Sequence, residues 1–226
     1  MRPKFFMLAA LAVLAGCATP NSQYYSLQSL PQANFAPVSQ INDAINVQSV
    51  SVPAQVDRPQ IVLTGRTGGE VSLLNESLWA APLGDEIRQA LAGHLSHQLG
   101  VPDIDSAGAP AGLALWGVRL TVHRFESVYG QQALLQASWR LSKTPANTAP
   151  GLPSVCRATA VVPASGGIDA LVTAHQRALS AVSALIGAQI QAARQGLPVG
   201  RATVPSSVAP IVTMQGCTAS VTGAAG

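Results

Sequence analysis

The sequence predicts an α+β fold: a single domain in which a mixed, mostly antiparallel sheet carries two main helices packed on one face. In several segments apolar residues alternate with polar ones, which is typical of strands with one buried face. Two other segments repeat apolar residues at helical spacing. The segments follow in the order strands, helix, three strands, helix, and 48% of the chain is hydrophobic, enough for a substantial core.

The N-terminal part of the domain predicts short strands separated by proline and glycine turns. These strands are expected at 24–27, 45–52, 60–63 and 71–74. The glycine-rich stretch 64–69 lies between the last two and lacks the Gly-Lys-Ser/Thr ending of a phosphate loop. It is predicted to be a hairpin turn.

A helix follows, in which leucine or isoleucine recurs every four residues from Leu83 to Leu99. Pro82 suits the first turn, where its missing N–H costs nothing, and Gly100 ends the helix. Asp85 and Glu86 are expected to complement the helix dipole.

Three longer strands are expected at about 116–122, 133–141 and 156–162, arranged as an antiparallel meander. Trp116 and Trp139 share the inward phase of their strands and are predicted core residues. A second helix is expected from Asp169, a good N-cap residue, to about residue 190.

The N-terminus carries Arg2 and Lys4, then an apolar run, then Leu14-Ala15-Gly16-Cys17. This arrangement resembles the signal peptide and lipobox of bacterial lipoproteins, in which cleavage precedes a lipid-modified cysteine. It predicts a signal peptide over 1–16, a lipidated tether over 17–22 anchored through Cys17, and a domain over 23–195. The apolar run is too short to span a bilayer, which needs about 20 residues. Ala18 follows the cysteine, and by the same resemblance the anchor is expected in the outer membrane with the body facing the periplasm.

The segment 196–226 is rich in proline and small residues and is expected to be a flexible tail. Cys156 and Cys217 remain after lipidation of Cys17. In an oxidising periplasm they either form a disulfide, which would staple the tail to the sheet, or Cys156 stays a buried thiol.

Composition and motifs argue against several functional classes. Once Arg2 and Lys4 leave with the signal peptide, 11 basic and 10 acidic residues remain, without the basic cluster expected of a nucleic-acid-binding protein. We find no catalytic cluster, cofactor motif or metal site in the sequence. His94 and His97 lie one helical turn apart, but no further metal ligand is near them in sequence, so a solvated helix face is the preferred interpretation.

Several segments resemble the ABC-type transport auxiliary lipoproteins, the PqiC/YmbA group. The main one is Val52-Pro53-Ala54-Gln55-Val56-Asp57-Arg58-Pro59-Gln60-Ile61-Val62. The others are Tyr24-Tyr25-Ser26-Leu27, Trp79-Ala80-Ala81-Pro82-Leu83, Arg124-Phe125-Glu126 and Trp139. Together they cover most of residues 17–190.

The resemblance implies a non-enzymatic component of an MCE-type intermembrane lipid transport system. It implies an MCE-domain protein and an inner-membrane component as partners, phospholipid or other apolar cargo, and a homo-oligomeric ring. Asp57, Arg58, Pro59 and Trp79 are the candidate partner interface, although the first three also suit a turn before a strand and Trp79 also suits packing on the helix. A structural or assembly lipoprotein of the envelope is the alternative function, and a periplasmic hydrolase is the third.

Overall fold

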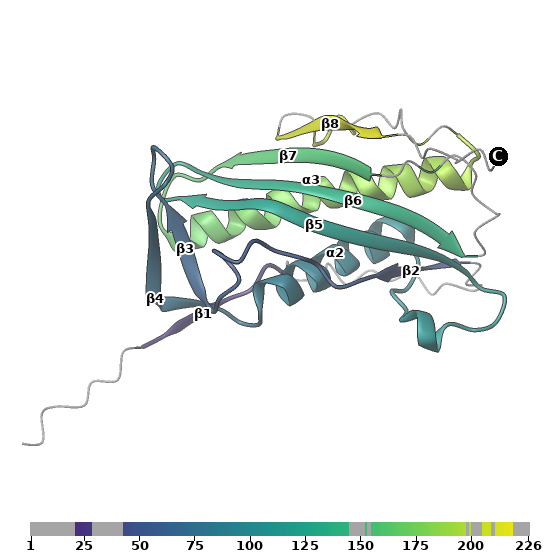
Figure 1. Cartoon of the computed structure of the whole chain (residues 1–226), viewed down its shortest axis with the longest axis horizontal. Helices are drawn as coiled ribbons and strands as arrows, with labels where there is room; N and C mark the ends of the chain where they lie inside the picture. Colours follow the sequence, from purple (N-terminus) through teal and green to yellow (C-terminus); the bar gives the residue numbers. More distant parts are fainter. Residues whose placement is uncertain are drawn as a thin grey trace, which may run out of the picture.

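The computed structural model describes residues 21–28, 43–144, 152, 155–197, 199, 205–208 and 211–218. Its centre is an antiparallel meander of β5 (Ala114–Val128), β6 (Gln132–Thr144) and β7 (Val155–Pro163) (Figure 1). Leu120 pairs with Trp139, and Leu135 pairs with Ala160, so apolar side chains of adjacent strands share one face. The meander predicted from the alternating pattern is confirmed.

Five further strands complete an eight-stranded sheet of order β1–β4–β3–β5–β6–β7–β8, with β2 paired to β5 outside that path. They are β1 (Gln23–Tyr25), β2 (Asp43–Val47), β3 (Gln60–Thr64), β4 (Val71–Trp79) and β8 (Val212–Thr218). β2 and β3 both run parallel to β5, β2 beside its beginning and β3 beside its end. β1 runs parallel to the end of β4. The sheet is therefore mixed but mostly antiparallel, as predicted.

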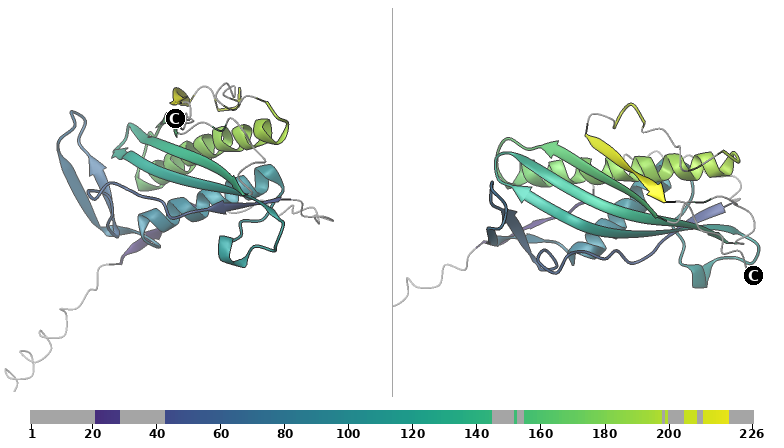
Figure 2. Two further views of the ribbon diagram at one scale, coloured as in Figure 1. Left: turned by 45° about the vertical axis from the view of Figure 1, so that its right-hand side comes forward. Right: turned by 45° about the horizontal axis from the view of Figure 1, so that its top comes forward.

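β3 and β4 form the predicted hairpin, whose turn contains Gly68 and Gly69 at φ of 74° and 79°. Such positive φ angles suit glycine because it lacks a Cβ. The register shifts after Gln60, which pairs with Leu78 while the next residue, Ile61, pairs with Leu74. The hairpin stands across one end of the long strands (Figures 1 and 2).

Helices α2 (Leu83–Leu99) and α3 (Ile168–Arg194) pack against each other on one face of the sheet (Figure 2). Gly100 ends α2 in the left-handed conformation, as its position predicts. Two details differ from expectation. Pro82 is the N-cap of α2, and α3 begins at Ile168 with Gly167 as its N-cap, so Asp169 lies in the first turn and makes no side-chain cap.

The core lies between the sheet and the helices. It includes Trp116 and Trp139, which are 0% and 1% exposed, as predicted from the phase of their strands. Both indole N–H groups are satisfied: Trp116 donates to Asp43 at 2.9 Å and Trp139 donates to Gln189 at 2.7 Å. Buried tryptophan needs such partners because an unpaired N–H would lose its hydrogen bond to water.

The expectation of a flexible tail over 196–226 is wrong for residues 212–218. These residues form β8, which pairs antiparallel with β7 and buries Val212 to 4% exposure. The apolar positions Val212, Met214 and Cys217 do not keep a strict alternation, because the register shifts between Arg157 and Ala158 of β7. Because of this irregularity, the strand does not show the apolar alternation by which strands are predicted from sequence.

Candidate partner-binding surface

The loop between β2 and β3 holds three of the four candidate interface residues on the surface. Asp57, Arg58 and Pro59 are all exposed, whereas the preceding Val56 is 8% exposed and packs into the core. The backbone N–H groups of Val56 and Asp57 both donate to the carbonyl of Pro53, at 3.0 and 3.1 Å. The buried valine and this tight turn hold the two charged residues outward.

The fourth candidate, Trp79, is buried, unlike the other three. It is 5% exposed, and its ring meets Phe125 edge to face, with ring centroids 6.0 Å apart. Its backbone N–H donates to the carbonyl of Pro59 at 2.7 Å, which ties the end of β4 to the loop. The burial favours the packing role of Trp79 over an interface role, so the candidate surface reduces to Asp57, Arg58 and Pro59.

The segment that leads from the tether into the domain is fixed by both helices. Glu86, which is 2% exposed, accepts hydrogen bonds from the Ser26 hydroxyl at 2.7 Å and from the Leu27 backbone N–H at 2.8 Å. Gln176 of α3 donates to the Ser26 carbonyl at 3.0 Å, and Leu27 is 0% exposed. A charged acceptor makes these bonds stronger than neutral ones. The clamp therefore sets where the tether leaves the body.

Sequence reasoning assigned Glu86 only to the helix dipole and missed this clamp. The partners are separated by 59 and 60 residues, so no local pattern could show them. The available signal was the position itself, since Glu86 lies one residue before Ile87 on the inward side of an amphipathic helix.

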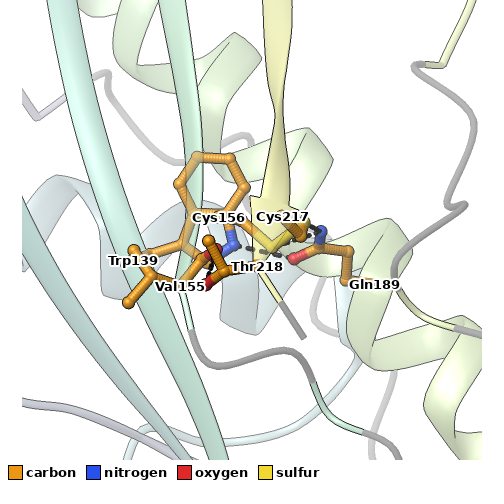
Figure 3. Close-up of a disulfide and its surroundings, with 6 residues drawn as sticks. All are labelled: Trp139, Val155, Cys156, Gln189, Cys217 and Thr218. Carbon is orange, nitrogen blue, oxygen red and sulfur yellow. Dashed lines mark hydrogen bonds between the residues drawn. A yellow bond between two sulfur atoms is a disulfide. The ribbon is translucent and has the colours of Figure 1, made fainter. Parts of the chain in front are cut away.

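The structure joins Cys156 of β7 and Cys217 of β8 in a disulfide. Figure 3 shows Gln189 of α3 beside it: the Gln189 amide donates toward the two sulfurs, at 3.2 and 3.4 Å, while its carbonyl accepts from Trp139. Gln189 is 0% exposed. This buried contact links α3, the centre of the sheet and the last strand.

A serine and a histidine meet in the core without forming a catalytic arrangement. The Ser127 hydroxyl and His175 Nε2 lie 2.8 Å apart, and both residues are 1% exposed. His175 stacks on Phe125 at 3.9 Å, and its Nδ1 has no hydrogen-bond partner in the described part of the chain. Burial lowers the pKa of His175 to about 3. A hydrolase would need an accessible serine and a carboxylate on Nδ1, and this pair offers neither.

The two helix histidines are also placed. His97 is exposed, whereas His94 is half-buried, and burial together with the charge of His97 lowers the pKa of His94. Among the described residues, no three His, Cys, Asp or Glu side chains gather where they could hold a metal ion.

A depression of about 640 Å³ lies beside β2 and the start of β5. Its charged groups are engaged with neighbours: Arg88 pairs with Asp103 at 3.2 Å, and Arg119 donates to Gln48 at 2.8 Å. Its lining is mainly polar, which does not suit the apolar cargo implied by the sequence resemblance.

Cys17 lies outside the described residues, so the structure gives no geometry for the anchor. Within the described segments, no helix is both long enough and apolar enough to cross a membrane.

Comparison with known proteins identifies relatives across most of the domain. The sequence profile of the ABC-type transport auxiliary lipoprotein component family matches residues 25–187. The intermembrane transport lipoprotein PqiC of Escherichia coli (strain K12) is 29% identical over 141 residues, which are 62% of this chain and 74% of that protein. PqiC of Shigella flexneri gives the same values.

Two solved structures share the fold. A protein from Xanthomonas campestris superimposes with a TM-score of 0.56 at 18% identity, over 76% of this chain and 96% of its own. A second, uncharacterised protein gives a TM-score of 0.54 at 20% identity, over 75% of this chain and 99% of its own. At these identities the likeness concerns the fold alone.

Proposed function

This chain belongs to the ABC-type transport auxiliary lipoprotein family, which is not an enzyme family, and we propose that it is a lipid-anchored outer-membrane component of an MCE-type intermembrane lipid transport system. In this role it docks or receives a periplasm-spanning MCE-domain partner, which works with an inner-membrane component. The observation that carries the proposal is the family match over 25–187 directly behind a lipobox at Cys17.

The structure supports a role in binding and positioning. The core between sheet and helices is filled by side chains, including both central tryptophans, and the depression beside β2 is polar. The Glu86 clamp and Gln176 hold Ser26 and Leu27 on the two helices, so the point at which the chain enters the body is fixed. A docking component needs both features: a rigid body and a fixed attachment point.

We assign the contact, with the partner or between copies in a homo-oligomeric ring, to the loop of Asp57, Arg58 and Pro59. Neither charged side chain hydrogen-bonds or pairs with another described residue, so both are available to a partner. Arginine is enriched among the residues that give protein interfaces most of their affinity. In a closed ring the same contact repeats at every subunit, so one change weakens all of them.

The test is capture of the MCE-domain partner from detergent-solubilised membranes by the lipidated protein. Arg58→Glu should reduce capture or self-association while circular dichroism and membrane fractionation stay normal. Arg157→Glu, a charge reversal at an exposed position of β7, is the matched control and should behave as wild type.

Three outcomes would count against the proposal. If wild type captures no MCE-domain protein, the alternative of a structural or assembly lipoprotein gains support. If the Arg58→Glu variant captures the partner and self-associates fully, the loop is not the contact. If metabolic labelling shows no fatty acid on Cys17, the proposed lipid anchor is wrong.

A further inference from the structure

The exposed large apolar side chains of the described residues are not spread evenly over the molecule. Four of them are Tyr24 (67% exposed), Val71 (54%), Leu73 (43%) and Tyr129 (53%), which we call the apolar end. Scattered apolar residues on a surface need no explanation, but several at one end of an elongated body do.

The strand pairing places these four residues at the same end. Val71 and Leu73 lie on β4 beside Thr64 and Val62 of β3, and they share one face of the hairpin. Tyr129 lies in the turn after β5, where β3 also ends, because Leu63 pairs with Ser127. Tyr24 lies on β1 beside Leu78 of β4. Figure 1 shows the hairpin, the turn and β1 at one end of the long strands.

The other exposed residues help to define this distribution. Val161, 36% exposed, lies two residues before the end of β7, on the side of the same turn, since Pro163 pairs with Gln132. Leu197, 53% exposed, follows α3 and lies at the opposite end. Helix α3 has 27 residues, and at a rise of about 1.5 Å each it separates the two ends by about 40 Å.

The tether leaves the body at the apolar end. Gln23, the first residue of β1, lies six positions after Cys17, and a fully extended chain covers at most about 3.6 Å per residue. Gln23 must therefore lie within about 20 Å of the lipid-modified cysteine. The Glu86 clamp holds Ser26 and Leu27 on the body, so the segment after β1 does not detach and add to the length of the tether.

We propose that the apolar end is a membrane-contacting surface, on which Tyr24, Val71, Leu73 and Tyr129 rest in the interfacial region of the bilayer that holds the anchor. The inference rests on the lipid anchor of the proposed function. Tyrosine suits this environment because its ring is apolar and its hydroxyl stays hydrated, and tyrosine is enriched at membrane interfaces.

A bilayer is favoured over a protein partner as the occupant because of the reach of the tether and the spacing of the residues. Tyr24 lies beside Leu78 of β4, which is seven residues from Val71 on the same strand. The apolar side chains are therefore separated along the end and do not form one compact patch. A planar lipid surface can meet separated side chains at the same time, whereas a protein interface concentrates them at its centre. The opposite end, about 40 Å away along α3, is left facing the periplasm. The Asp57-Arg58-Pro59 loop lies beside β1 at the membrane-proximal end, because Trp79 donates to the Pro59 carbonyl and pairs with Tyr25.

The experiment uses the full lipidated chain in vesicles of phosphatidylethanolamine and phosphatidylglycerol that contain nitroxide-labelled lipid. An environment-sensitive fluorophore is attached at Leu73→Cys or, as the matched control, at Leu197→Cys, since both are exposed leucines. We expect blue-shifted emission and quenching by the nitroxide lipid at position 73, with neither effect at position 197. The structural disulfide and the lipidated Cys17 leave the introduced cysteine as the reactive thiol.

A second measurement uses the non-lipidated Cys17→Ser chain. Adding Val71→Ser and Leu73→Ser should lower its partitioning onto the same vesicles about tenfold, because two apolar side chains lose their contact with lipid. The urea unfolding midpoint should hold, since both side chains are exposed.

Two results would overturn the proposal. One is equal and low quenching at positions 73 and 197; the other is a blue shift at position 73 that depends on protein concentration but not on lipid, which would make the apolar end an interface between copies. Mass spectrometry of the N-terminal peptide in the same samples reports lipidation of Cys17 separately, so loss of the anchor and loss of the contact are distinguished.

Discussion

Breaking the link between Cys156 and Cys217 should destabilise the domain strongly. The two cysteines are 61 residues apart, so their disulfide closes a long loop in the unfolded chain. On the chain-entropy model, a loop of this length contributes about 4 kcal/mol to stability. A change of 1 kcal/mol shifts the melting temperature of a domain of this size by about 2–4 °C. Reduction should therefore lower the melting temperature by about 8–16 °C.

The assay is thermal unfolding of the Cys17→Ser chain, followed by circular dichroism with and without reductant. Cys217→Ser should behave like the reduced protein. Truncation after Gly196 should cost at least as much, because it removes the disulfide together with the β7–β8 ladder and the buried Val212. Truncation after Thr218 is the matched control, since it keeps β8 and the disulfide and should leave the melting temperature nearly unchanged.

The reasoning would be refuted if reduction lowered the melting temperature by less than about 2 °C, well below the chain-entropy estimate. A chain ending at Gly196 that melts like the full-length protein would refute it as well. In that case β8 would contribute no net stability, and the segment would behave as the independent tail that its composition predicts.

Two further predictions concern buried polar groups. His175 has a pKa of about 3 in the folded protein, whereas an unfolded histidine titrates near 6.5. Below pH 6.5 the unfolded chain takes up a proton that buried His175 does not, so the free energy of unfolding falls as the pH drops from 6.5 toward 3. The loss should reach about 2 kcal/mol at pH 5, and His175→Gln should flatten this acid dependence in urea titrations; an unchanged slope would contradict the burial argument. Glu86→Ala should lower the free energy of unfolding by about 3 kcal/mol, because two charge-assisted hydrogen bonds are lost, and should expose the segment around Leu27 to limited proteolysis. The control Asp85→Ala, at the neighbouring exposed position, should change stability by less than about 0.5 kcal/mol. Equal protease resistance of Glu86→Ala and wild type would show that the clamp does not hold the tether exit.

The candidate site was predictable only in part. The Asp57-Arg58-Pro59 loop is a candidate because its residues stand together in the sequence and resemble a family motif, and the structure adds that all three are exposed. Trp79 belonged to the same motif, but whether it faces a partner or Phe125 depends on how β4 packs, which no sequence spacing states. The Glu86 clamp joins residues about 60 positions apart and left no local signal.

The sequence by itself determined the elements with strong periodicity and the family. Alternation set the meander of β5, β6 and β7, helical spacing set α2, and Cys17 behind an apolar run predicted the anchor. These features are local, because the period of a segment reports which of its faces is buried. Periodicity does not report which segments meet. Only the tertiary structure decided that β2 and β3 share one edge of β5 and that residues 212–218 form β8. Such long-range pairings depend on the closure of loops whose lengths hardly constrain their partners, so they are fixed by the packing of the whole domain.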